Sequence, residues 1–97
     1  MLALIARLPK LQTLLQAPTS VPSRQLAADA VSEISRLNTP EDQSMAGLAV
    51  LKVLKNRGDA GVQDFVERAL EVMQKFPHFA RPRAAVAIRA LTALAKS

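Results

Sequence analysis

The stretch Met45-Ala-Gly-Leu-Ala-Val-Leu-Lys-Val-Leu54 decides the fold, because nine of its ten residues carry no charge. On a helical wheel its apolar residues sweep more than half the circumference, so a helix here contacts neighbours on two sides. Burial of each larger side chain contributes roughly 1.5–3 kcal/mol, whereas a surface charge pair contributes about 0.3–0.5 kcal/mol. We therefore expect this segment to be the buried central helix.

Gly47 lies inside this segment, where glycine costs about 1 kcal/mol of helix propensity relative to alanine. A glycine there would allow another helix to approach closely, which a side chain would prevent. The alternative is that the glycine is merely tolerated.

Start and stop signals extend the pattern to either side of the central helix. Thr39 is a suitable N-cap, Pro40 suits the first helical position, and Gly58 ends the helix. Ser23 and Asp59 are expected to cap the second and fourth helices. Together with the apolar periodicity, these signals predict helices over residues 2–16 with a kink or fresh start at Pro9, 24–37, 40–57, 60–76 and 82–96.

The composition bounds the class of protein. The 97 residues are 49% hydrophobic and 22% charged, which is typical of one small globular domain. Three Phe residues with no Trp or Tyr disfavour an all-β core, and the absence of Cys excludes disulfides and thiol catalysis. We predict one all-α domain over residues 1–97, with four to five helices in antiparallel hairpins, as a small bundle or a short helical-repeat array.

The second and last predicted helices are similar at an offset of 60 residues. Three positions are identical, namely Pro22/Pro82, Ala27/Ala87 and Ala30/Ala90. Conservative pairs fill the positions around them. This pattern favours a duplicated helix–loop–helix with the central helix between the copies. Chance matching of two Ala-rich amphipathic helices is the alternative.

The segment Arg83-Ala-Ala-Val-Ala-Ile-Arg-Ala-Leu-Thr-Ala-Leu-Ala-Lys96 resembles the second helix of HEAT-type repeats. Its ending from Ala90 is also similar to the FAST-kinase-like and octotricopeptide helical repeats of organellar RNA-associated proteins, although Thr92 replaces the aromatic residue of those families. The resemblance implies a concave binding surface, for RNA or for protein, and no catalysis.

The predicted last helix is apolar over most of its circumference, which is more surface than the fourth helix alone can cover. Repeat arrays normally end in a helix with a polar outer face. We therefore expect the cover to come from a protein partner or a parent assembly, and the alternative is a compact bundle that encloses this helix. The expected interface residues are Val86, Ala90, Leu91, Ala93 and Leu94.

Basic residues gather toward both ends, since residues 1–28 and 75–97 contain no acid. Arg24, Arg81 and Arg83 lie at predicted helix starts, where the helix dipole disfavours cations, so a bound anion would explain them. RNA phosphates and acidic side chains are the candidates. Solvated arginines are the alternative, with Arg81 reaching back to carbonyls at the end of the fourth helix. Further basic patches are expected from Arg89 with Lys96, and from Lys52 and Lys55 with Arg57.

No motif indicates catalysis or a cofactor. His78 is the only histidine and has no partner at metal-ligand spacing, and there is no Gly-rich phosphate loop or nucleophile motif. We expect no catalytic residue, metal, cofactor or small-molecule substrate. Because aromatic residues for base stacking are few, RNA binding would not be sequence-specific.

The first twenty residues are Leu-rich, basic and free of acids, which fits a mitochondrial presequence better than a secretory signal. We favour an uncleaved structural helix. No apolar run reaches the length of a membrane span. The sequence leaves the compartment unknown, and an intracellular location, mitochondrial or otherwise organellar, is compatible with it.

These features predict a non-catalytic interaction or structural module of a larger assembly. It would dock a protein partner through the last helix, while its basic ends contact an anionic surface such as RNA in an organellar ribonucleoprotein. The alternative is a pure protein–protein adaptor, or an effector or targeting domain, with no nucleic-acid role.

Overall fold

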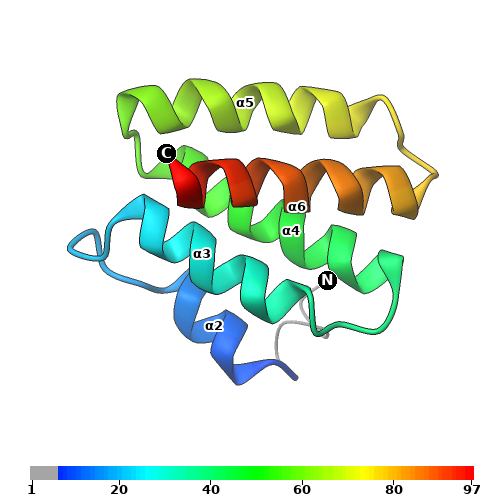
Figure 1. Cartoon of the computed structure of the whole chain (residues 1–97), viewed down its shortest axis with the longest axis horizontal. Coiled ribbons are helices and arrows are strands. Elements are labelled where there is room, and N and C mark those ends of the chain that lie inside the picture. The colour runs from blue at the N-terminus through cyan, green and yellow to red at the C-terminus, as the bar shows by residue number, and fades with distance from the viewer. Residues whose placement is uncertain (1–6) are drawn as a thin grey trace.

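The computed structural model describes residues 7–97, which form five α-helices and no strand. The prediction of an all-α fold is confirmed. In Figure 1, α3 to α6 run alternately in opposite directions, as expected for antiparallel hairpins. The part of the first predicted helix before residue 7 lies outside the described residues. The helices are α2 (Pro9–Leu15), α3 (Ser23–Ile34), α4 (Pro40–Asn56), α5 (Ala60–Gln74) and α6 (Ala80–Lys96).

The ends of α4 follow from the local signals in the sequence. The Thr39 hydroxyl accepts a hydrogen bond from the Asp42 amide at 3.1 Å, and Pro40 is the first helical residue. Beyond the other end, Gly58 has a φ of +74°, a conformation that residues with a side chain rarely adopt. The Gly58 amide donates to the Lys55 carbonyl, which closes the last turn.

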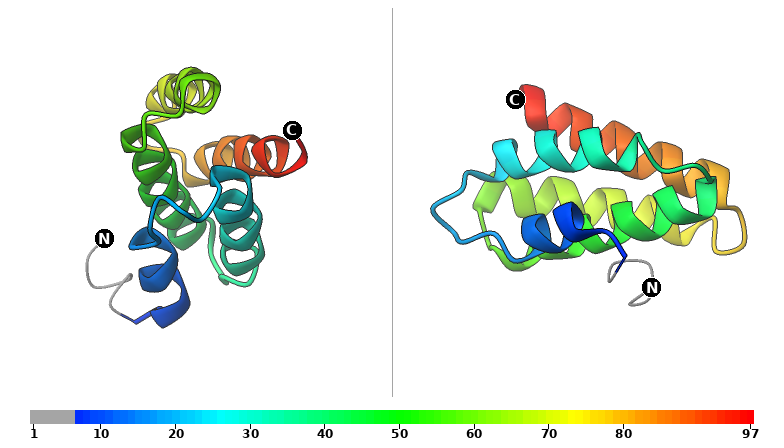
Figure 2. Two further views of the ribbon diagram at one scale, coloured as in Figure 1. Left: turned by 90° about the vertical axis from the view of Figure 1, so that its left-hand side faces the viewer. Right: turned by 90° about the horizontal axis from the view of Figure 1, so that it is seen from below.

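Two helices, α4 and α6, occupy the centre of the bundle. The left view of Figure 2 shows them next to each other, with α5 on one side and α2 and α3 on the other. α4 packs against each of the other four described helices, and α6 packs against α3, α4 and α5. The expectation of a buried helix at 45–54 is therefore confirmed, but α6 shares the central position. The largest fully buried side chains are Leu11, Leu26, Ile34, Val50, Leu51, Leu54, Val66, Met73 and Leu91.

The two central helices meet at Gly47 and Ala87. A Cβ atom on Gly47 would lie 2.6 Å from the Ala87 Cβ atom, a separation that real Cβ atoms essentially never show. The interpretation that Gly47 permits the close approach of another helix is therefore confirmed.

The expectation that Ala90, Leu91 and Leu94 contact a protein partner is wrong. They are 6%, 0% and 5% exposed, respectively, and belong to the core of the bundle. Besides α5, the neighbour expected from chain order, α3 and α4 also cover α6. The bundle itself encloses the inner face of α6.

The helices matched at the offset of 60 residues, α3 and α6, pack directly against each other. Their paired alanines are all buried: Ala27 and Ala87, and Ala30 and Ala90. Closely packed helices favour small residues on their shared face whether or not they arose by duplication. The internal repeat and the helical-repeat resemblance therefore stay predictions.

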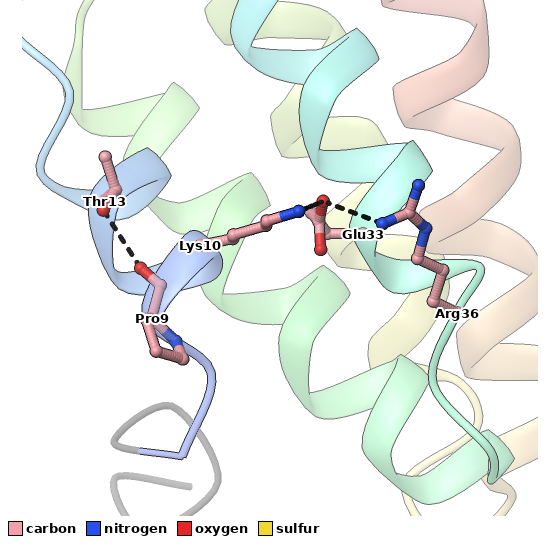
Figure 3. Close-up of polar contacts among 5 residues, drawn as sticks. All are labelled: Pro9, Lys10, Thr13, Glu33 and Arg36. Carbon is pink, nitrogen blue, oxygen red and sulfur yellow. Dashed lines mark hydrogen bonds and ion pairs between the residues drawn. The ribbon is translucent and has the colours of Figure 1, made fainter.

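A small polar cluster lies where α2 meets α3 (Figure 3). Glu33 on α3 forms ion pairs with Lys10 of α2 at 3.9 Å and with Arg36 at 3.7 Å. Both cationic side chains are largely exposed, and such pairs contribute about 0–1 kcal/mol. The burial of Leu11 is therefore the stronger attachment of α2.

We expect Gly47→Ala to destabilise the domain and Gly61→Ala to stabilise it. Overpacking against Ala87 costs about 1–3 kcal/mol and helix propensity returns about 1 kcal/mol, so the net loss is up to about 2 kcal/mol. A Cβ atom on Gly61, within α5, meets nothing within 4 Å, so alanine there should add about 0.4–1 kcal/mol. Urea denaturation measures both free energies of unfolding, and equal stability of the two variants would contradict the close packing.

Candidate functional site

A groove runs along the surface between α4 and α5, and we call it the α4–α5 groove. Its apolar floor combines half-buried Leu48 and Leu70 with buried Met73. Charged side chains form its two walls. The groove is lined by Leu48, Lys52, Lys55 and Asn56 of α4, by Glu67, Leu70, Glu71, Met73 and Gln74 of α5, and by Arg83 of α6.

The structure brings three of the predicted anion-binding residues, Lys52, Lys55 and Arg83, to this groove. Lys52 and Lys55 are both exposed on α4. Because they are three residues apart, they lie one turn apart on the same side of the helix. The opposite wall carries Glu67 and Glu71, one turn apart on α5. The sequence pattern identified the basic wall but not the acidic wall facing it.

Arg83 has a structural partner within the bundle. Its guanidinium donates a hydrogen bond to the Met73 carbonyl at 3.0 Å, in the last turn of α5. The sequence suggests a contact of this kind for Arg81, as the alternative to an anion site, but Arg81 is exposed. A cation at the carbonyl end of a helix is favourable, so α5 accounts for Arg83 without a bound anion.

The other predicted cations are dispersed. Arg89 and Lys96 are exposed on the outer face of α6, beside half-buried Ile88 and Thr92. Arg24 lines a separate pocket at the far end of α6, together with Phe65 of α5.

The starts of α3 and α6 lie at opposite ends of the bundle because the two helices are antiparallel (Figure 1). The Arg24 position and the Arg81/Arg83 position therefore do not combine into one anion site.

Two of the predicted interface residues remain accessible. Ala93 is exposed and Val86 is half-buried, both on α6. Val86 packs against the edge of the core, and Ala93 lines the same pocket as Phe65, which is 39% exposed.

Arg57 anchors the connection between α2 and α3. Its guanidinium donates hydrogen bonds to the carbonyls of Pro18 at 2.9 Å and Val21 at 2.5 Å, with longer contacts to Ala17 and the Ser23 hydroxyl. Arg57 was assigned to a basic patch from the sequence, but its charge is used within the fold. No sequence signal could reveal this role, because the acceptors are main-chain oxygens distant in the chain.

Ser23 and Asp59 bind each other rather than capping their helices. The Ser23 hydroxyl donates to Asp59 Oδ2 at 2.5 Å, and neither side chain accepts a capping hydrogen bond. Asp59 does hold the N-cap position of α5, whereas Pro22 holds that of α3. The contact joins the start of α3 to the α4–α5 corner, beside the Arg57 anchor.

No group of three or more His, Cys, Asp or Glu side chains within residues 7–97 is arranged to hold a metal ion.

None of the helices described here combines the length and the apolar character needed to cross a bilayer.

No protein-family model matches the chain, and neither a curated protein nor a solved structure shows significant similarity to it.

We expect Arg57→Met to lower the free energy of unfolding by about 1–3 kcal/mol, because it leaves several loop carbonyls without their charged donor. Arg68→Met, at an exposed position of α5, is the matched control and should stay within about 0.5 kcal/mol of wild type. Urea denaturation gives the energies. Faster trypsin cleavage after Arg24 would report the released loop, and equal stability and cleavage in the two variants would exclude the anchor.

Proposed function

We propose that the protein is a non-catalytic interaction module that docks a protein partner in the α4–α5 groove, as a subunit or domain of a larger assembly. The last helix, which the sequence suggests for this contact, has its apolar inner face enclosed by its own bundle. The groove takes its place as the docking surface.

The observation that carries the proposal is the combination of an apolar floor with charged walls. Leu48 and Leu70 are half-buried in the groove, so a partner can still remove part of their surface from water. Apolar surface at the centre and polar groups at the rim is the usual organisation of a protein interface. A groove between two helices also matches a common mode of helix recognition.

An anionic surface such as RNA is a second candidate partner. The observation in its favour is that Arg89 and Lys96 share the outer face of α6, where the described structure places no acidic side chain in the same pocket. Binding of this kind would be electrostatic and salt-sensitive. It would use a different face from the α4–α5 groove.

Affinity capture from native extract, at moderate and at high salt, tests the proposal. We expect a defined set of proteins to stay bound to wild type at high salt and to be lost with Leu70→Asp, which places a charge in the groove. Phe79→Asp is the control, because Phe79 is 62% exposed and lies outside the groove. Circular dichroism verifies that each variant is folded.

Two outcomes would count against docking in the groove. Capture that survives Leu70→Asp would place the partner elsewhere. RNA that elutes with salt and is lost with the double variant Arg89→Glu/Lys96→Glu, while no protein depends on Leu70, would favour the second candidate.

A further inference from the structure

We infer that the partner segment in the α4–α5 groove is an amphipathic helix with acidic residues along one flank and basic residues along the other, and that the groove fixes its direction. This inference rests on the proposed function and specifies the chemistry of the partner. The observation behind it is the opposite charge of the two walls, basic on α4 and acidic on α5.

The wall charges are free to act on a partner. Lys52, Lys55 and Glu71 are exposed and Glu67 is half-buried, and no ion pair joins the two walls in the described part of the chain. Each wall therefore presents its own sign of charge to whatever lies between them. A partner helix can satisfy both walls only if its two flanks differ in charge.

The spacing of the wall residues suits a helix in the groove. Lys52 and Lys55 are separated by three positions and Glu67 and Glu71 by four, so each pair follows one side of its helix. Of the apolar floor residues, Leu48 lies one turn before Lys52 on α4, and Leu70 lies between Glu67 and Glu71 along α5. An apolar stripe with i, i+3, i+4, i+7 spacing would rest on this floor, as in other helix-in-groove complexes.

A nucleic acid suits this groove poorly. Phosphates that approach Lys52 and Lys55 would also approach Glu67 and Glu71 on the facing wall. Like charges juxtaposed across an interface oppose binding. The acidic wall therefore favours a protein helix over RNA at this position.

The direction of the bound helix follows from symmetry. If such a helix is turned end over end while its apolar stripe stays on the floor, its two flanks exchange walls. One direction then brings unlike charges together at both walls, and the other brings like charges together at both. The walls therefore discriminate between the two directions, which a groove with uniform charge could not do.

The test uses a synthetic helical peptide with a leucine stripe, glutamates on one flank, lysines on the other and a nitroxide label at its N-terminus. Broadening of amide resonances in isotope-labelled full-length protein reports which end of the groove receives the label. Leu48 and Gln74 mark one end, and Asn56 and Glu67 mark the other. We expect one end to be broadened, corresponding to a preference of about tenfold for one direction.

The decisive comparison is a protein with exchanged walls, Lys52→Glu/Lys55→Glu/Glu67→Lys/Glu71→Lys, whose net charge equals that of wild type. The broadening should move to the opposite end of the groove. If this variant does not fold, a peptide with exchanged flanks gives the same reversal on the wild-type protein.

Broadening of both ends, or of the same end in both proteins, would overturn the inference, as would failure of the peptide to bind. An oligonucleotide that shifts the groove amides in place of the peptide would also overturn it. The proposed function is judged separately by whether capture depends on Leu70. If capture is lost with Leu70→Asp but the peptide binds without a preferred direction, the proposed function is supported and the inference is wrong.

Discussion

The contact between Gly47 and Ala87 is the constraint on which the rest of the structure depends. With no side chain on one helix and a methyl group on the other, α4 and α6 can approach far more closely than helices with larger residues at their contact. That approach allows α3, α4 and α5 to enclose the inner face of α6, including Leu91. A bulkier residue at either position would force the central pair apart or distort the packing around it.

The helices themselves could be predicted because their signals are local. Thr39 and Pro40 start α4, Gly58 ends it, and the periodic apolar residues of α5 face one side. Enclosure of α6 could not be predicted in the same way, because it depends on how many neighbours surround that helix. Periodicity shows that a helix has a wide apolar face but does not identify what covers that face.

The candidate site shows a similar division. The basic residues could be identified from the sequence, yet their tasks differ, since Arg83 completes the end of α5 while Lys52 and Lys55 stay free in the groove. The acidic wall comes from another helix, and its position opposite the lysines is a result of packing. Arg57 binds main-chain carbonyls that are distant in the chain. Because every residue type has such a carbonyl, this contact could not be predicted from the sequence.

The Arg57 anchor also affects how freely the sequence can vary. Apart from the Ser23 hydroxyl, its hydrogen bonds go to main-chain oxygens of residues 17–21, which every amino acid possesses. The connection between α2 and α3 can therefore exchange many of its side chains and keep its shape, provided that its length is preserved. The shape of the connection depends instead on one arginine, which lies 39 and 40 positions further along the chain from its contacts at Pro18 and Ala17. Related chains should thus tolerate substitutions in the segment that this residue holds in place.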